Sequence, residues 1–188
     1  MGLKFIGIDL AALEKNPTGT AVYDGSGFEC STLHTDGELL ALVARHRPSI
    51  IAIDAPLSLP YGRCCFNDDC CGPRKMRVCD RMMISMGYRV FPPGFSYMKQ
   101  LTLRGVALNK GLEARGFKVI EAHPRTSMRI LGIQGFAEAK SEHESDACAA
   151  ALTAWLYEKG KCIDLTGPDG TTVIPARDLG SFIRLQGL

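Results

Sequence analysis

A run of four apolar residues, Ile50 to Ile53, restricts the fold of this chain more than any other feature. Pro48 and Pro56 bound the run, and none of its residues is polar. A segment that is apolar on both faces is typical of a central strand in a sheet covered by helices. We therefore expect an α/β fold built around this strand.

Three more strands are expected before the central one. Leu3–Leu10 and Thr18–Asp24 are apolar, β-rich runs, and Phe28–His34 follows after a turn signal. Their short connections predict an antiparallel meander. Asp36 then caps a predicted helix that ends near Pro48.

The segment 56–97 is irregular, rich in proline and cysteine, with one short helix expected around Asp80–Met86. The elements predicted after it are a helix at Tyr97–Arg115, a strand at Phe117–Ala122, helices at Pro124–Leu131 and Ser141–Lys159, and a β-hairpin at Cys162–Pro175. This order predicts one mixed α/β domain over residues 1–188, with segment 56–97 as an insert after the fourth strand.

Composition limits the classes of partner. Lys and Arg number 22 against 20 Asp and Glu, a net charge of +2, which excludes a polybasic protein that binds through bulk charge. The stretch 62–104 is locally basic, with eight Lys and Arg against three Asp. No stretch reaches the ~20 apolar residues that cross a bilayer, and the N-terminus lacks the features of a signal peptide. We therefore expect a cytoplasmic protein without a membrane partner.

Acidic residues end the predicted strands. Asp9 closes the first strand and Asp54 the central one, and ligands of α/β sheets gather beyond the carboxyl ends of strands. If these strands are parallel neighbours, the two carboxylates lie side by side and repel unless a cation neutralises them. Glu121 ends the next strand, and Asp146 lies one turn beyond His143 on the last long helix. We favour a shared divalent-metal site.

Each acid also has a purely structural explanation. Asp54 can cap the following turn, and Asp146 can gain from the dipole of its helix. Glu121 can form an ion pair with Arg104 or Arg125. The acid that closes the first strand is the hardest to explain in this way, because a carboxylate at the end of a buried strand costs free energy unless it is paired.

Seven segments occur in order along the chain: Gly7-Ile8-Asp9-Leu10-Ala11, Asn16-Pro17-Thr18-Gly19, Ile53-Asp54-Ala55-Pro56-Leu57, Cys79-Asp80-Arg81, Met98-Lys99-Gln100-Leu101-Thr102-Leu103-Arg104-Gly105, Ile120-Glu121-Ala122-His123-Pro124 and Ser145-Asp146-Ala147. Together they resemble the domain of unknown function 429 family, whose members are predicted nucleases with an RNase H-like fold. The resemblance implies a mixed five-stranded sheet, flanked by helices, with strand 1 between strands 2 and 4. His143-x-x-Asp146 also resembles a feature of RuvC-type Holliday-junction resolvases, which act as dimers, so a homodimer is allowed.

The resulting hypothesis is a nuclease acting on DNA or RNA. Asp9, Asp54 and Asp146 would bind two Mg²⁺ or Mn²⁺ ions, with Glu121 or His143 completing the site for attack of water on a phosphodiester. Residues expected to contact phosphates are Arg81, Lys99 and Arg104. Aromatic residues that could stack on bases are Tyr88, Phe91, Phe95 and Tyr97, although packing of the insert onto the domain is the favoured interpretation of each. The alternatives are a nucleotide-binding phosphotransferase-like domain and a non-catalytic module that binds nucleic acid or another partner.

The cysteines of the insert form a separate group, Cys64-Cys65-x4-Cys70-Cys71-x7-Cys79. One thiolate from each pair together with Cys79, for example Cys65, Cys70 and Cys79, could bind zinc with a fourth ligand. Disulfides and free thiols are the competing interpretations, and the sequence leaves all three open.

Overall fold

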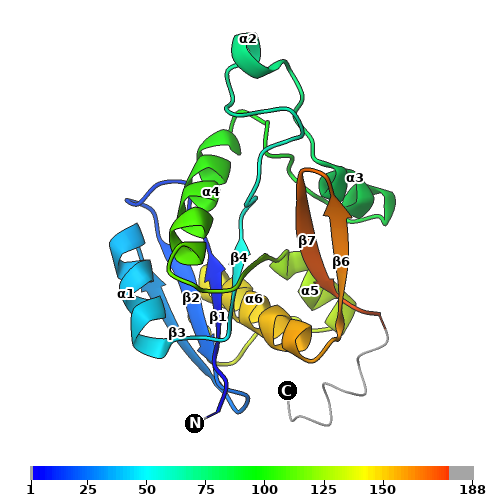
Figure 1. The fold of residues 1–188 in the computed structure, drawn as a ribbon. Helices are drawn as coiled ribbons and strands as arrows, with labels where there is room; N and C mark the ends of the chain where they lie inside the picture. Colours follow the sequence, from blue (N-terminus) through cyan, green and yellow to red (C-terminus); the bar gives the residue numbers. More distant parts are fainter. Residues whose placement is uncertain (1, 178–188) are drawn as a thin grey trace.

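A five-stranded mixed sheet forms the centre of the protein in a computed structural model that describes residues 2–177 (Figure 1). Its strands are β1 Phe5–Asp9, β2 Thr18–Tyr23, β3 Phe28–Leu33, β4 Ile50–Asp54 and β5 Val119–Glu121, in the order β3-β2-β1-β4-β5. The first three form the predicted antiparallel meander, whereas β4 pairs in parallel with both β1 and β5. The predicted α/β class and mixed sheet are confirmed; residue 1 and residues 178–188 of the predicted domain lie outside the described part.

The remaining elements follow the predicted order. The helices are α1 Asp36–His46, α2 Asp68–Cys71, α3 Val78–Ser85, α4 Lys99–Glu113, α5 Pro124–Leu131 and α6 Glu142–Glu158, and the hairpin consists of β6 Cys162–Gly167 and β7 Gly170–Pro175. Only α2, a single turn within the insert, has no counterpart among the predicted elements. Between residues 2 and 177, no helix combines the length and the apolar character that crossing a bilayer requires.

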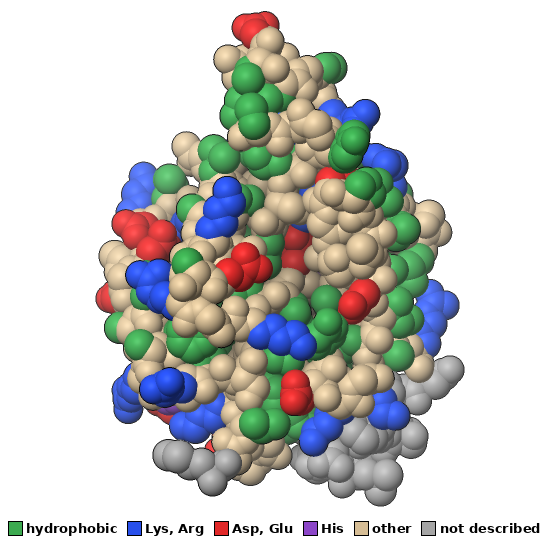
Figure 2. Space-filling model, viewed as in Figure 1, with side chains coloured by type: hydrophobic (Ala, Val, Ile, Leu, Met, Phe, Trp, Pro, Cys, Tyr) green, Lys and Arg blue, Asp and Glu red, His purple; other side chains and the backbone are tan. Residues whose placement is uncertain are grey.

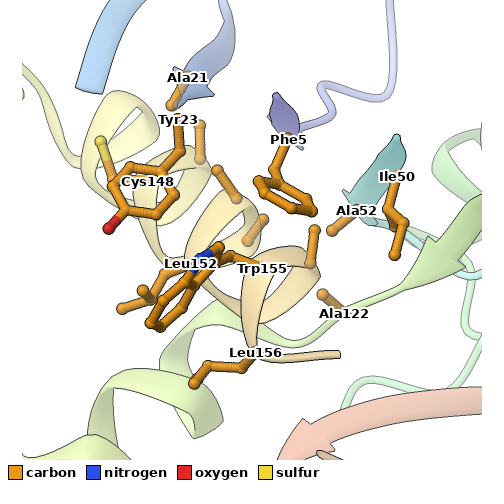
Figure 3. Close-up of a cluster of buried hydrophobic side chains, with 14 of the residues drawn as sticks. Phe5, Ala21, Tyr23, Ile50, Ala52, Ala122, Cys148, Leu152, Trp155 and Leu156 are labelled. Carbon is orange, nitrogen blue, oxygen red and sulfur yellow. The ribbon is translucent and has the colours of Figure 1, made fainter. Parts of the chain in front are cut away.

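Two apolar clusters lie on opposite faces of the sheet. Phe5 of β1 belongs to the cluster formed with α6, whereas its neighbour Ile6 belongs to the cluster formed with α1 and α4. Figure 3 shows the first cluster, to which the sheet contributes Phe5 and Ala52 and α6 contributes Leu152 and Trp155. All four residues of the apolar run 50–53 are completely buried, so the central strand is covered on both faces, as predicted.

The backbone of α6 lies directly against β1 and β2, because both strands carry a glycine at the contact. A Cβ atom on Gly7 would lie 1.9 Å from the carbonyl oxygen of Ala147, and one on Gly19 would lie 2.0 Å from that of His143. Any larger residue at either position would force the helix off the sheet. The glycines thus set the position of the first turns of α6 relative to the end of β1.

Two helix caps differ in detail from the prediction. Thr35, not Asp36, is the N-cap of α1, in a capping box with Glu38. Ser141 caps α6 as predicted, accepting a hydrogen bond from the backbone N–H of Glu144. The Glu144 carboxylate accepts from the N–H of Lys140 rather than from that of Ser141, so the second half of the predicted capping box is shifted by one residue.

The close contact of α6 with the sheet leads to a stability prediction. Gly7→Ala should lower the free energy of unfolding by about 1–3 kcal/mol or more. Overpacking usually costs this much, and here the new Cβ meets backbone atoms rather than a flexible side chain. Urea unfolding followed by circular dichroism measures the change. Gly27→Ala is the matched control, since a Cβ there has no neighbour within 4 Å; equal effects of the two substitutions would contradict the prediction.

Candidate functional site

Asp9 and Asp54 are register partners in the parallel pair β1–β4. Each is the last residue of its strand, so both side chains leave the sheet at the same edge. Residues paired in this way project to the same face. For Asp9 that face is the one covered by α6, because Gly7, two residues earlier, contacts the helix. The predicted juxtaposition of the two carboxylates is therefore present.

The first turns of α6 add Asp146 and His143. The His143 Nδ1 atom lies 2.6 Å from Oδ2 of Asp9, and the two atoms share a hydrogen bond. Asp146 accepts a hydrogen bond of 2.9 Å from Nε of Arg125, the second residue of α5. We call Asp9, Asp54 and Asp146, with the neighbouring His143 and Arg125, the acidic site.

The Asp54 carboxylate is the least compensated member of the acidic site. Burial raises its pKa well above the usual value, and the charges of Asp9 and Asp146 raise it further. Burial also raises the pKa of Asp9 and of Asp146, against the opposing effects of His143 and Arg125. Among the hydrogen bonds of residues 2–177, none reaches the side chain of Asp54. A half-buried carboxylate that stands beside two others and lacks such a donor marks a position that a cation can reach and would stabilise.

Arg125 is a member that the sequence did not single out for this site. Its guanidinium bridges Asp146 and, at 3.2 Å, Glu142, while 59 % of its side chain remains exposed. Its position could have indicated this role, because Arg125 is the second residue of the helix that follows β5, at the edge of the sheet where the acids lie.

Glu121, predicted as a further ligand, does not join the acidic site. Arg77 donates to both of its carboxylate oxygens at 2.6 Å, and Thr172 and the N–H of Leu57 donate at 2.8 Å. The oxygens are thus occupied by four hydrogen bonds. The alternative that Glu121 forms an ion pair is the right one, but the partner is Arg77, which is 44 residues away, not Arg104 or Arg125.

The guanidinium of Arg77 also forms an ion pair with Asp80. It donates to both carboxylate oxygens of Asp80, at 2.8 and 3.3 Å, and all three charged groups are buried. Thr172 lies on β7, so this ion cluster fastens α3 and the hairpin to the end of β5. Its role is structural, and removing one partner from such a cluster usually costs about 3–5 kcal/mol.

Arg104, predicted to contact phosphate, is buried inside the protein instead. Its guanidinium donates to the carbonyl oxygens of Ala11 and His34, both at 2.8 Å, and to the Asp36 carboxylate. The next residue, Gly105, lies against the carbonyl of Pro56. These contacts fix the segments that follow Asp9 and Asp54, so Arg104 supports the acidic site without being free to bind a ligand.

The other two predicted phosphate contacts lie on the insert and at the start of α4. Lys99 is half-buried, with its ammonium 3.4 Å from the carbonyl oxygen of Phe66 and 5.8 Å from the ring centroid of the same residue. Arg81 is exposed on α3, the helix that packs against the hairpin. Neither contacts the acidic site. On the face shown in Figure 2, basic and acidic side chains are interspersed rather than gathered in one basic patch.

Three of the four predicted stacking residues form an aromatic group at the surface. Phe91 and Tyr97 are 61 % and 58 % exposed and pack edge to face, with their ring centroids 5.6 Å apart. Phe95 lies 6.0 Å from Tyr97. Tyr88 is different: it is buried with Met83 between α3 and the hairpin, so its role is packing.

The cysteines that lie together are not the set that was predicted. The sulfur atoms of Cys64, Cys65, Cys70 and Cys71 all lie within 4.8 Å of one another, so this group could bind a metal such as zinc. Cys79, predicted as a ligand, is fully buried in the cluster beneath the hairpin and takes no part. Among the described residues, no other set of three or more potential ligands is so compact, and the oxygens of the acidic site are therefore more widely spread.

No protein-family model matches the chain, and a search of curated proteins finds no match either. The chemistry available is thus that of the acidic site itself: three carboxylates, an imidazole hydrogen-bonded to one of them, and a guanidinium at the rim. Such a set can hold divalent cations, move a proton and contact an anionic group.

The raised pKa of Asp54 gives a pH-dependent prediction. In metal-free protein the neutral Asp54 carboxyl, present at low pH, is favourable for folding. This contribution to the free energy of unfolding is lost as the pH rises through the folded-state pKa of Asp54. A pKa difference of one between the folded and unfolded states corresponds to about 1.4 kcal/mol of stability. Asp54→Asn should therefore be more stable than the wild type at about pH 8 in EDTA, with the difference vanishing towards about pH 4.

Urea unfolding at several pH values measures this difference. Glu113→Gln, at the exposed end of α4, is the control and should follow the wild type throughout. An Asp54→Asn protein that is less stable than the wild type at high pH would show that the ionised carboxylate stabilises the fold.

Proposed function

We propose that this protein is a metal-dependent nuclease with an RNase H-like fold, and that Asp9, Asp54 and Asp146 are the groups that bind Mg²⁺ or Mn²⁺. The observation that carries the proposal is the half-buried Asp54 carboxylate, which stands beside two other acids and has no hydrogen-bond donor among the described residues. A structural carboxylate would be expected to have a partner, as Glu121 has.

The sheet order supports the fold assignment. Strand β1 lies between β2 and β4, which is the adjacency that the resemblance to the domain of unknown function 429 family implies. The three acids stand at the ends of β1 and β4 and in the second turn of α6, the last long helix. The segments that carry the resemblance also include Arg104 and Gly105, which hold the loops after β1 and β4.

The donor set fits hard divalent cations. Carboxylate oxygens are the ligands that Mg²⁺ and Mn²⁺ prefer, and the site offers them from three residues. A pair of ions ~3.5–4 Å apart needs ligands spread over both ions, which suits carboxylates that do not all converge on one point. Such ions, when bound, supply a water of lowered pKa and stabilise the leaving oxygen.

The other two members of the site have roles that follow from their contacts. Asp9 orients the His143 ring through Nδ1, which leaves Nε2 able to carry a proton to or from the reacting oxygens. Asp146 and Glu142 hold the Arg125 guanidinium, whose remaining N–H groups can donate to a phosphate oxygen. The exposed aromatic group of Phe91 and Tyr97 provides faces on which unpaired bases can stack.

Metal binding and cleavage test the proposal together. Calorimetric titration of Mn²⁺ should show binding to the wild type and its loss or great weakening in Asp9→Asn and Asp54→Asn. Cleavage of labelled junctions, hybrids, flaps and single strands in Mn²⁺ should fall on the order of 1000-fold or more in both variants, because a catalytic metal contributes several kcal/mol and each ~1.4 kcal/mol is tenfold in rate.

Glu113→Gln serves as the control here too and should bind and cleave as the wild type does. Mn²⁺ binding that is unchanged in both variants would overturn the acidic site as a metal site. Binding of nucleic acid that is indifferent to Asp9→Asn and falls steeply with salt, without cleavage of any substrate, would favour the non-catalytic binding module.

A further inference from the structure

The outer part of the insert, residues 63–76, projects from the protein and has no apolar core. Figure 1 shows α2 at the end of this projection, away from both faces of the sheet, and Figure 2 shows how narrow it is. No side chain between residues 64 and 76 is fully buried. Burial of apolar surface therefore contributes little to its structure, and something else must hold it.

One buried cation organises the two sides of this projection. Arg63 donates to the carbonyl oxygens of Cys65, Gly72 and Arg74 and forms an ion pair of 2.9 Å with Asp68. The guanidinium thus joins the residues around the first cysteine pair to those beyond the second. The backbone is shaped so that both pairs face one another.

The four sulfur atoms lie as close together as the ligands of a tetrahedral metal site, or closer. Cys71 is 2.9 Å from Cys64, 3.6 Å from Cys65 and 3.4 Å from Cys70, and Cys64 is 3.6 Å from Cys70. The edge of a tetrahedron of sulfurs around zinc is roughly 3.8 Å for a Zn–S bond of ~2.3 Å. Because Cys71 is close to all three others, the arrangement is one compact group rather than two separate pairs.

Backbone hydrogen-bond donors and cationic side chains lie beside the sulfur atoms. The N–H groups of Cys64 and Asn67 donate to the sulfurs of Cys71 and Cys65, at 3.2 and 3.4 Å. Cationic residues lie near the projection as well, since the charges of Arg63, Lys99 and Lys75 act on Asp68.

We propose that Cys64, Cys65, Cys70 and Cys71 together bind one Zn²⁺ ion, and that this ion holds the projection in its folded form. Binding converts four thiols to thiolates and releases their protons, giving a site with a net charge of −2 that the neighbouring cations offset. Both cysteines of each adjacent pair are ligands. The site is independent of the acidic site, because it uses sulfur ligands on a different part of the chain.

Metal content tests the proposal directly. Full-length protein purified without chelators should contain about one zinc per chain by plasma mass spectrometry. Cys64→Ser and Cys70→Ser should each lose most of it; both residues are exposed, so neither change disturbs the core. Cys162→Ser, outside the group, should keep its zinc, and Asp9→Asn should keep it even if its Mn²⁺ binding and cleavage are lost.

Two further measurements separate zinc from the other states of the thiols. Cobalt added to metal-free, reduced protein should give the strong visible absorption of a tetrahedral thiolate site, and chelation should make residues 63–76 sensitive to protease. Thiol labelling should increase on chelation and not on reduction. Wild-type protein that holds no zinc and gives no such cobalt spectrum, or thiols that become reactive only on reduction, would overturn the proposal.

Discussion

The close contact between the backbone of α6 and two glycines of the sheet is the constraint on which most of this structure depends. Gly7 and Gly19 leave no room for a side chain, so the helix rests on the strands themselves and buries nearly its whole length. The same contact carries His143 and Asp146 to the end of β1, where Asp9 lies. Core and acidic site are therefore consequences of one packing arrangement, and neither can change without the other.

A second constraint explains why four acids divide into two roles. Glu121 stands at the end of β5, at the same edge of the sheet as Asp9 and Asp54, but Arg77 takes both of its oxygens. Leaving Arg77 buried without that carboxylate would be costly, so Glu121 is committed to structure. Within residues 2–177, Asp54 has no such partner, and this contrast between two carboxylates on neighbouring strands separates the proposed metal ligand from the structural acid.

Local sequence pattern predicted the strands, the meander, α5 and the hairpin, because each depends on apolar periodicity and turn residues within a short stretch. It also placed Asp9, Asp54 and Asp146 correctly at the ends of elements. What it could not supply were pairings across the insert: nothing near Arg77 indicates a partner 44 residues away. Arg104 and Cys79 were misjudged because residue type alone gives no measure of burial, whereas packing was already the favoured interpretation of Tyr88.

The register between β1 and β4 has a consequence for how such a protein can vary. Because Asp9 and Asp54 are paired through the backbone ladder, inserting or deleting one residue within β4 would turn its carboxylate to the opposite face of the sheet. The outer part of the insert after β4, residues 63–76, pairs with no strand of the sheet and extends far from it. Changes in length are thus better tolerated in this outer part than within β4, so new recognition properties can be acquired there without moving the carboxylates.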